Sequence, residues 1–471
     1  MTRHFLKNCQ APPVRWHNIS VWDTKAHSLA KEKASVPFLH LEDILDSYFR
    51  KHPHLISTIT QFENRMPQLA ANLAKAQQRA NLADFTVGAL GLWADGVEYR
   101  NKSSLEVISA NFPTQPSWDR IPLFAIHKKY ICQCGCLGRH TWHDIFHVCT
   151  LMFQALARGI AGIRWPLVHV GRDWPVLRGF FSLPAWNSEY FCRKYWITLQ
   201  KKRQVHPDSP DFANRCTEEE FIAWCLEKGS LSPLTACPGF SIWEAVVIDW
   251  MHTVDLGVLQ DFSGNAIWQL VQRMPGNNND DRLAKLWLMI QDWYKEHKPK
   301  SRIDNLTFPM FRPSAQKSPK LRAKAGETRN LLRCLAEFTA PCFTSTADTV
   351  MHTTACVADA FLQLMHVVSS VPYQLSKAQE LCTYICKLYA ALSEKAEAEG
   401  KAEWACKPKY HMFQELIHFG GDLGSPADFW TYVDEAWVGI AAQMASVAGG
   451  HNGPHVSGQR LLNRFRMDWG R

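Results

Sequence analysis

The chain has 471 residues, of which 46% are apolar, 20% are charged and 19 are tryptophan. This length suggests two or three structural units, and the high apolar content excludes global intrinsic disorder. The net charge of +8, from 52 Lys and Arg against 44 Asp and Glu, mildly favours a polyanionic partner, because basic side chains release counterions from phosphates.

The sequence indicates an intracellular protein. Its first residues, MTRHFLKNCQAPPVRW, contain no apolar segment of the kind found in secretory signals. No apolar run approaches the ~20 residues of a membrane-spanning helix, so we expect no membrane partner. The 15 cysteines are scattered and odd in number. This favours free thiols or a metal site in a reducing compartment over a disulfide framework.

The first 80 residues are predicted to be helical, because LEDILDSYFRKH and PQLAANLAKAQQRANLADF repeat apolar residues at three- and four-residue spacing. Three strands are predicted next, at residues 85–93, 104–112 and 121–132. The first is an apolar run, FTVGALGLW, followed by Ala94-Asp95-Gly96, which is typical of a turn.

An amphipathic helix is predicted at residues 142–160 and a fourth strand at residues 165–170, WPLVHV. This β-β-β-α-β order predicts an α/β fold with a mixed sheet, in which side chains at strand C-termini face a common crevice. Residues from about 200 to 400 are predicted to be mostly helical, as in AKLWLMIQDWYKEH and ACVADAFLQLMHVV. The final part, from KPKYHMFQELIHF onward, is also predicted to be helical.

Two aspartates follow predicted strands, Asp95 after the first and Asp173 after the fourth. Either one alone is most often a turn or cap residue. On neighbouring strand ends, however, they can share hard cations such as Mg²⁺, which prefers oxygen ligands. Two such ions about 3.5–4 Å apart support phosphodiester cleavage, and a third carboxylate from a helix would complete the site.

A second polar cluster lies in VVIDWMHTVDLGVLQDF, where Asp249, His252 and Asp255 follow one another at three-residue spacing. In a helix these side chains lie near one face. The Asp–His pair could orient the imidazole toward an active site, and the alternative is a hydrogen-bonded pair that fastens two helices. Near the C-terminus Asp434 and Glu435 are adjacent, so at most one of them faces a shared site.

A different type of metal ligand is found in CQCGCLGRH, which contains Cys132, Cys134, Cys136 and His140. Thiolates and imidazole are zinc ligands, but the spacing is not the usual C-x2-C, and ordinary buried or loop thiols are the alternative. On the helix predicted to follow, His143 and His147 have the spacing of zinc proteases. An aspartate replaces the glutamate of HExxH and a third ligand is missing, so a zinc metallohydrolase is a remote alternative.

Four sequence blocks between residue 85 and the C-terminus occur in a distinctive order. They are LWADGVEY, HVGRDWPVLRGFFSLPAWNSEYFCRKYW, IDWMHTVDLGVLQDFSG, and KPKYHMFQELIHF with FWTYVDEAWVGIAAQMA. In order and separation these blocks resemble transposases of the CACTA (En/Spm) and Kyakuja–Dileera–Zisupton groups, especially transposon-derived proteins of dinoflagellates. The segment SPKLRAKAGETRNLL is similar to a stretch in the helical insertion of those proteins.

The resemblance implies a DDE transposase with an RNase H-like core and an all-helical insertion before the last acidic residue. It makes Asp95, Asp173 and Glu435 the catalytic ligands of Mg²⁺ or Mn²⁺, with Asp434 as the alternative third acid. The implied reaction is metal-dependent cleavage and strand transfer of transposon DNA ends. Double-stranded DNA is then the partner, the nucleus is the expected compartment, and a homodimer is expected because two ends must be brought together.

The apolar periodicity and the resemblance together divide the chain into four parts. A helical N-terminal segment at 1–80 is followed by the first part of the core at 81–200, the helical insertion at 201–400, and a C-terminal helical return at 401–471 that carries the last acid. Asp249 and His252 match the C/D-x-x-H signature of the insertion, and Asp255 is expected to support them.

The chain departs from the family pattern in two places. Cys192 is followed by Arg193, Lys194, Tyr195 and Trp196, where the family has a C-x-x-C-like pair, so a zinc knuckle is not expected there. No N-terminal DNA-binding zinc finger is visible. The main alternative to an active transposase is therefore a domesticated or truncated derivative that binds DNA or acts as a scaffold without catalysis.

Overall fold

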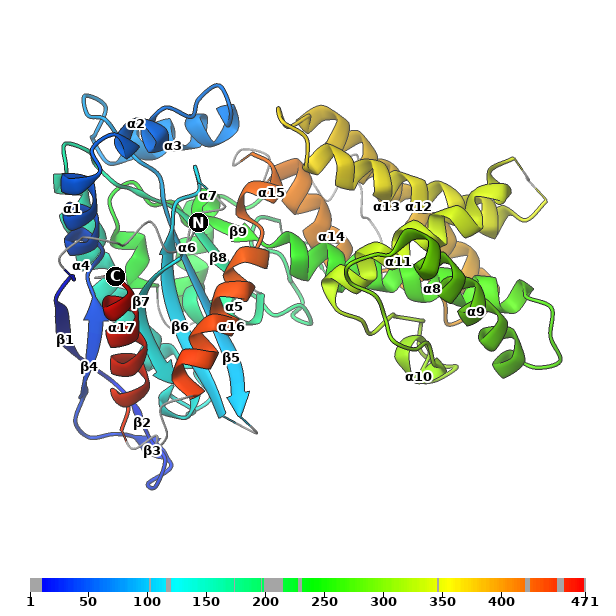
Figure 1. The fold of residues 1–471 in the computed structure, drawn as a ribbon, viewed down its shortest axis with the longest axis horizontal. Coiled ribbons are helices and arrows are strands. Elements are labelled where there is room, and N and C mark those ends of the chain that lie inside the picture. The colour runs from blue at the N-terminus through cyan, green and yellow to red at the C-terminus, as the bar shows by residue number, and fades with distance from the viewer. Residues whose placement is uncertain are drawn as a thin grey trace.

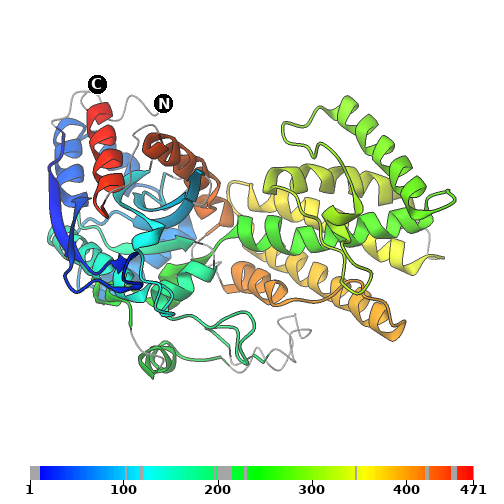
Figure 2. The same cartoon turned by 90° about the horizontal axis from the view of Figure 1, so that it is seen from below.

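The computed structural model describes residues 11–100, 103–115, 120–172, 174–195, 197–198, 215–227, 231–344, 347–419, 424–446 and 453–469. They form two lobes (Figures 1 and 2). One lobe contains the sheet and the first and last described segments of the chain, and the other is built from helices of the middle of the chain. The protein is thus a mixed α/β fold in which a five-stranded mixed sheet is followed by a long helical region.

The five-stranded sheet forms the centre of the α/β lobe. Its strands are β5 (Leu90–Arg100), β6 (Ser103–Asn111), β7 (Ile121–His127), β8 (Leu167–Arg172) and β9 (Val246–Ile248). They lie in the order β7-β6-β5-β8-β9; the first three are antiparallel, and β8 and β9 are parallel to β5. The predicted β-β-β-α-β order is observed, and β9 extends the sheet from within a segment predicted to be helical.

Helices cover both faces of this sheet (Figure 1). α4 (Arg139–Arg158) contributes its apolar side to the large buried core on one face. On the other face α16 (Tyr432–Ser446) packs on β5, and α17 (Val456–Trp469) packs on β7. The end of the chain therefore returns to the sheet after the helical lobe is complete.

The alternation of side chains along β5 decides which face Asp95 occupies. Leu92 and Ala94 belong to the core shared with α4. Asp95 lies opposite Val107 in the β5–β6 ladder, and Val107 is buried with Ala441 of α16. Because successive strand residues point to opposite faces, Asp95 faces α16.

The prediction of a helical segment at 1–80 is wrong for its first part. β1 (Val14–Ile19) pairs antiparallel with β4 (Ala34–Leu39), and two shorter strands, β2 (Trp22–Asp23) and β3 (Ser28–Leu29), pair with each other. Each strand is defined by its pairing with another segment, which periodicity within one segment does not reveal. The helices that follow are α1 (Leu41–Lys51), α2 (Leu55–Thr60) and α3 (Pro67–Arg79).

The boundaries of the first core strand also differ from the prediction. The strand was expected at 85–93 with a turn at Ala94-Asp95-Gly96, whereas β5 runs from Leu90 to Arg100 and pairs through both Asp95 and Gly96. Ladder hydrogen bonds to β6 therefore override the local turn preference of the Asp-Gly pair. On its other side β5 pairs with β8 only as far as Trp93↔Gly171.

The helical lobe is built on long helices with one continuous buried core. The chief helices are α8 (Leu259–Arg273), α9 (Asn279–His297), α11 (Ala325–Thr339), α12 (Thr349–Val368), α13 (Leu375–Ala398) and α14 (Pro408–Gln414). Its shorter helices are α10 (Phe308–Phe311) and α15 (Pro426–Phe429). Three other helices precede β9 and contribute to the core of the α/β lobe: α5 (Trp174–Phe181), α6 (Glu218–Glu227) and α7 (Ile242–Ala245). Two segments have π-helical hydrogen bonding, Met251–Val258 before α8 and Glu415–Phe419 after α14.

These elements shift the expected boundaries of the insertion. The helical lobe begins after β9 rather than at residue 201, and it still includes α14, which was assigned to the C-terminal return. No helix in the described part of the chain is both long and apolar enough to cross a membrane.

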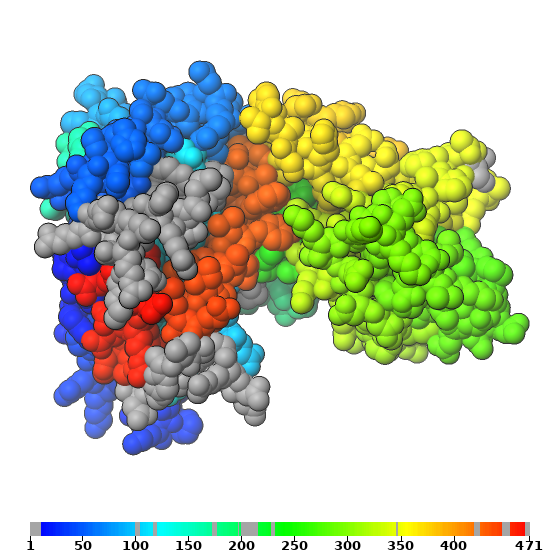
Figure 3. Space-filling model, in the orientation of Figure 1, coloured from blue at the N-terminus to red at the C-terminus, as the bar shows by residue number. Residues whose placement is uncertain are grey.

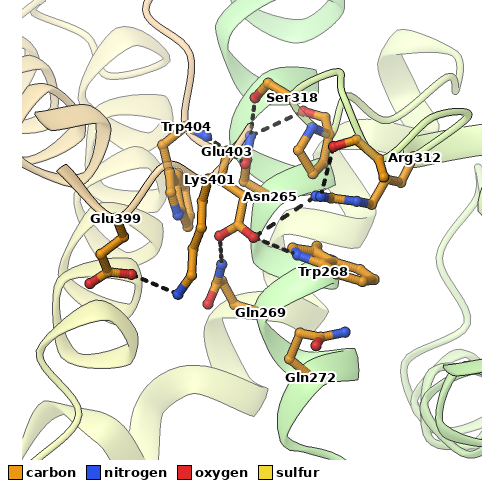
Figure 4. A network of polar contacts seen from close by, with 12 residues as sticks. Asn265, Trp268, Gln269, Gln272, Arg312, Ser318, Glu399, Lys401, Glu403 and Trp404 are labelled. Carbon is orange, nitrogen blue, oxygen red and sulfur yellow. Dashed lines mark hydrogen bonds and ion pairs between the residues drawn. The ribbon is translucent and has the colours of Figure 1, made fainter. Parts of the chain in front are cut away.

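Helix α8 is the element on which the irregular segments of the helical lobe are fastened (Figure 4). Glu403 accepts hydrogen bonds from Trp268 Nε1 at 2.8 Å and from Gln269 Nε2 at 2.6 Å. One turn earlier, a Cβ atom on Gly264 would lie 2.6 Å from the backbone of Lys320. Only glycine permits so close a crossing, so the segment around residue 320 is held directly against α8.

Candidate functional site

Asp95 and Glu435 meet between the sheet and α16. Asp95 projects from β5, and Glu435 lies in the first turn of the helix that packs on β5. Their carboxyl groups are hydrogen-bonded to each other, and burial together with the charge of Asp95 raises the pKa of Glu435 to about 8. Two carboxyls in such contact share a proton, because like charges this close do not both ionise. Two of the three predicted acids are thus brought together.

The third predicted acid, Asp173, lies outside the described residues. The flanking elements are described: β8 ends at Arg172 and α5 begins at Trp174. Beyond the last β5–β8 pair, Trp93↔Gly171, the sequence carries an aspartate two residues further along in each case, at 95 and at 173.

Asp249 and His252 lie beside the acid pair. Asp249 follows β9 directly, and its Oδ2 accepts hydrogen bonds at 2.7 Å from both Nδ1 and the backbone N–H of His252. Its Oδ1 accepts the backbone N–H of Thr431 at 3.0 Å, next to α16. Nε2 of His252 is 3.8 Å from Oε1 of Glu435. The imidazole is therefore oriented toward the acids, and the aspartate also fastens the start of α16.

Asp255 belongs to a separate group of side chains. It is fully buried, pairs with Nε of Arg329 at 2.9 Å, and accepts a hydrogen bond from the Tyr432 hydroxyl. Burial raises the pKa of Asp255 to about 6, although the neighbouring Arg329 charge opposes this effect. Asp255 thus joins the π-helical segment to α11 and to the start of α16.

This raised pKa predicts a pH-dependent contribution to stability. Folded Asp255 is protonated up to about pH 6, whereas an unfolded aspartate ionises near pH 3.9. Protonation of Asp255 therefore stabilises the folded protein fully below the pKa of the unfolded state. This stabilisation is lost as the pH rises through the pKa of the folded state. Between pH 4 and 6.5 we expect the unfolding free energy of wild type to fall relative to Asp255→Asn by on the order of 2–3 kcal/mol.

Urea titrations across this pH range would measure the difference. Asp292→Asn is the control, because Asp292 is on the surface of α9 with 72% of its side chain exposed. A wild-type curve parallel to that of Asp255→Asn would contradict the prediction.

The neighbouring acid, Asp434, forms an ion pair with Arg120 instead of contacting Asp95. Both carboxylate oxygens pair with Arg120, Oδ1 with Nε at 2.5 Å and Oδ2 with Nη2 at 3.0 Å, and both side chains are almost completely buried. Adjacent residues of a helix point in different directions, so Glu435 and not Asp434 is the acid beside Asp95. Arg120 itself was not identified from the sequence.

His169 is a second residue that the sequence did not bring to attention. It is buried in β8, and a Cβ on Gly91 or Gly171 would come within 2.9 Å or 2.8 Å of its ring nitrogens. Burial first, and then the Arg120 charge, lower the pKa of His169 to about 4, so the imidazole is neutral near pH 7. Gly91 lies opposite His169 on β5, and Gly171 is two residues further along β8. These two small residues were the sequence signal that a large side chain lies between them.

The predicted sulfur-rich cluster does come together. Cys132, Cys134, Cys136 and His140 each offer a ligand atom, and these atoms all lie within 4.8 Å of one another. The cluster connects the end of β7 with the first turn of α4. Three thiols and one imidazole in this arrangement form a candidate metal site consistent with zinc.

The predicted protease-like pair is not part of that cluster. His143 and His147 are exposed on α4, and neither belongs to a group of three or more potential ligands among the described residues. The described residues therefore supply no third ligand for a zinc metallohydrolase.

A buried cluster of potential metal ligands includes Cys192, where no zinc knuckle was expected from the sequence. Cys192, His411 and Glu415 place one ligand atom each within 4.8 Å of the others. Glu415 also accepts a hydrogen bond from Nε of Arg193 at 3.4 Å. Burial opposes ionisation of Glu415, but the charges of Arg193 and Lys194 lower its pKa. The glutamate is thus already balanced by cations, and the cluster fastens the Cys192 segment to the helical lobe.

Comparison with known proteins adds no independent assignment. No protein-family model matches the chain, and no curated protein matches it in sequence. What the molecule itself presents is an acid pair, Asp95 and Glu435, with the Asp249–His252 pair beside it. At a different place it presents a compact cluster of thiols and imidazole. The candidate functional site is the first of these.

Proposed function

We propose that the protein is a DDE-type transposase or a close derivative, which cleaves and joins DNA ends with two divalent cations. The proposed ligands are Asp95, Asp173 and Glu435. The observation that carries the proposal is the direct contact between the Asp95 and Glu435 carboxyls. These residues are far apart in the sequence, and a contact between two acids is costly unless a cation or a shared proton offsets their repulsion.

The fold supports the same proposal. The strand order β7-β6-β5-β8-β9, with two parallel strands beside an antiparallel meander, is the order expected of an RNase H-like core. The helical lobe leaves the sheet after β9, and the chain returns to it with α16. In the space-filling view the residues from α14 to α16 bridge the two lobes (Figure 3). Glu435 thus comes directly after a helical insertion, where the resemblance requires its last acid.

The donor set suits magnesium rather than a softer metal. Asp95 and Glu435 offer only carboxylate oxygens, which Mg²⁺ prefers, and Glu435 keeps 37% of its side chain exposed. Bound cations would activate the attacking water or 3′-hydroxyl and stabilise the leaving oxygen. The exposure leaves room for a phosphodiester to approach the acids.

The Asp249–His252 pair has a defined part in this proposal. Because Nδ1 of His252 donates to Asp249, the neutral imidazole presents Nε2 as an acceptor on the side of Glu435. His252 can therefore take the proton that Asp95 and Glu435 share when both acids must ionise. A buried aspartate that orients the ring and stabilises its charged form is the usual device for such a histidine.

Basic residues of the helical lobe support DNA as the partner. Lys317, Arg322 and Lys324 are exposed in the segment between α10 and α11. The same segment reaches the π-helical element that carries His252, because Nζ of Lys320 donates to the carbonyl of Leu256 at 3.4 Å. Phosphate contacts from such side chains position a duplex without reading its sequence.

Replacing Lys317, Arg322 and Lys324 together by alanine should weaken DNA binding in a salt-dependent way. Each lost phosphate contact lowers the slope of log K against log salt by about 0.9, so the triple variant should lose about 2–3 from the slope. Fluorescence anisotropy with a duplex in EDTA, at several salt concentrations, measures the slope without cleavage.

The control variant removes the same number of positive charges from the α/β lobe instead of the helical lobe. Lys31, Lys51 and Arg158 are exposed, and the last two lie on helices of the α4 side of the sheet. Alanine at these three positions should leave the slope within about 1 of wild type. Equal losses in both triple variants would mean that the helical lobe has no specific part in binding.

The proposed function is tested by a nicking assay. Purified full-length protein is incubated with supercoiled DNA in Mg²⁺ or Mn²⁺, alongside Asp95→Asn and a sample with EDTA. Cleavage that requires both the metal and Asp95 would support the transposase. DNA binding without cleavage in any metal would favour the non-catalytic derivative, in which the fold and partner are kept and the reaction is lost.

Three further features of the proposal follow from the resemblance: cleavage of transposon ends with strand transfer, a homodimer that holds two ends, and a nuclear location. Size-exclusion chromatography with light scattering, in the presence and absence of DNA, addresses the dimer directly.

A further inference from the structure

The ligand atoms of the thiol–imidazole cluster lie close enough together to enclose a single zinc ion. Sγ of Cys132 lies 3.3 Å from Sγ of Cys134 and 3.6 Å from Sγ of Cys136. Nδ1 of His140 lies 3.4–3.6 Å from the three sulfurs. With Zn–S near 2.3 Å and Zn–N near 2.0–2.1 Å, tetrahedral geometry requires about 3.8 Å between sulfurs and about 3.6 Å between sulfur and nitrogen. These separations lie within about 0.5 Å of the values for a tetrahedral zinc ion, and the Cys132–Cys134 distance departs from them most. Small movements of the side chains would therefore place one ion at bonding distance from all four donors.

The loop that carries the thiols has a backbone that needs support. Gly135 and Gly138 have positive φ angles of 90° and 80°, and Leu137 between them has φ of 56°. A leucine rarely adopts this left-handed conformation, which costs free energy and persists only where the surroundings enforce it. Leu137 is also 49% exposed, so its own apolar burial does not enforce it.

Two of the four ligands are fixed by the rest of the fold. Cys132 is buried, and its backbone N–H donates to the Thr141 hydroxyl at 3.0 Å. His140 lies in the first turn of α4, next to Thr141. The remaining ligands, Cys134 and Cys136, are carried by the loop that returns to this point. A metal bound at this point would therefore join the loop to Cys132 and to the first turn of α4.

We propose that Cys132, Cys134, Cys136 and His140 bind one structural zinc ion that locks the loop between β7 and α4. All four coordination positions are filled by protein, which distinguishes a structural site from a catalytic one that keeps a position open. The site is separate from the Asp95–Glu435 pair and takes a different class of metal. It stands whether or not the acids bind magnesium.

The locked loop also reaches α5, which gives the zinc a wider effect. A Cβ atom on Gly179 would lie 2.8 Å from the carbonyl oxygen of Leu137, so the loop rests on the backbone of that helix. Phe180 of α5 in turn stacks edge-on against Trp142 and Phe146 of α4, at 4.9 Å and 4.5 Å between ring centroids. Loss of zinc should therefore loosen the α4–α5 contact and not only the loop.

The test is the zinc content of the full-length protein, purified without chelator and measured by plasma mass spectrometry. Wild type is expected to hold about one zinc per chain, and Cys134→Ser or His140→Ala should lower this at least about tenfold, since each removes one of four ligands. Cys342→Ser is the matched control, because Cys342 is partly exposed and lies outside the cluster. It should leave the zinc content unchanged.

A cobalt spectrum of wild type covers the case in which a variant fails to fold. Co²⁺ in this site should give thiolate charge-transfer absorption and the strong visible bands of a tetrahedral ion. Wild type without bound zinc and without these bands would overturn the proposal. It would also be overturned if zinc were kept by Cys134→Ser but lost in Cys192→Ser, since the metal would then lie in the buried Cys192 cluster.

Discussion

Glu435→Gln is expected to lower the proposed Mg²⁺-dependent DNA cleavage by at least about 10³-fold without lowering the unfolding free energy. The amide keeps the shape of the side chain and its hydrogen bond to Asp95, but it removes the charge that would hold a cation. Cations at such a site supply several kcal/mol of transition-state stabilisation, and each 1.4 kcal/mol is a factor of ten in rate. Single-turnover cleavage of a labelled duplex at saturating Mg²⁺ would measure the loss.

Stability should respond in the opposite direction from activity at this position. Two carboxyls in contact repel each other once both ionise, and Glu435 has its pKa raised to about 8 by burial and by Asp95. The glutamine variant removes this repulsion, so its unfolding free energy above pH 8 should equal or exceed that of wild type. A stabilised but inactive variant is the behaviour expected of an acid that is placed for a cation and not for packing.

Two further variants make this result specific. Glu394→Gln makes the same chemical change on the exposed surface of α13 and should retain full activity. Asp95→Asn should be as inactive as Glu435→Gln, and the double variant should be little worse than either, because residues that act as one unit are strongly non-additive. Wild-type cleavage rates in Glu435→Gln would remove it from the catalytic set.

The sequence was sufficient to predict the order of the core elements but not the extent of each strand. Periodicity and apolar runs located four of the five strands and α4, because each buries a continuous apolar stretch. β9 is only three residues long, too short for any periodic signal, and it exists because Val170, Gly171 and Arg172 of β8 provide a partner ladder. The turn expected at Asp95 failed for the same reason, since pairing with β6 decides the conformation there.

The candidate site was predicted only in part for a related reason. Asp95, Glu435 and the Asp249–His252 pair were identified from blocks of residues, and the structure brings them together. Arg120 was missed because its partner Asp434 is more than 300 residues away, and a buried ion pair leaves no local pattern. Choosing between Asp434 and Glu435 required coordinates, because only tertiary contacts show which of two adjacent acids faces β5.

For the thiol cluster the sequence spacing was unusual, but the structure brings the four side chains together. A C-x-C-x-C-x3-H pattern does not match the common zinc motifs, so the sequence favoured ordinary thiols. Positive φ angles at Gly135, Leu137 and Gly138 turn the loop so that alternate cysteines face the same point. Glycine spacing within the loop was the available signal, and it becomes interpretable only beside the histidine on α4.

Asp434→Leu should have the largest effect on folding of any single change at the site, lowering the unfolding free energy by about 3–5 kcal/mol. The substitution leaves the Arg120 guanidinium buried without its anion, and the cost of an uncompensated buried charge is of this size. Only 4% of the Arg120 side chain and 3% of the Asp434 side chain are exposed, so water cannot replace the lost partner. Urea denaturation at pH 7 would measure the change.

Replacing both partners separates the charge effect from packing. In Arg120→Met with Asp434→Leu neither charge remains, and such apolar replacements of buried pairs are often neutral or stabilising. The double variant should therefore recover most of the stability lost in Asp434→Leu and, with Glu435 intact, should retain Mg²⁺-dependent cleavage. If Asp434→Leu were instead stable but inactive, Asp434 would be the cation ligand, and the assignment of the two adjacent acids would have to be reversed. The two adjacent acids are thus expected to affect different properties. Glu435 faces Asp95 and should determine activity, whereas Asp434 faces Arg120 and should determine stability.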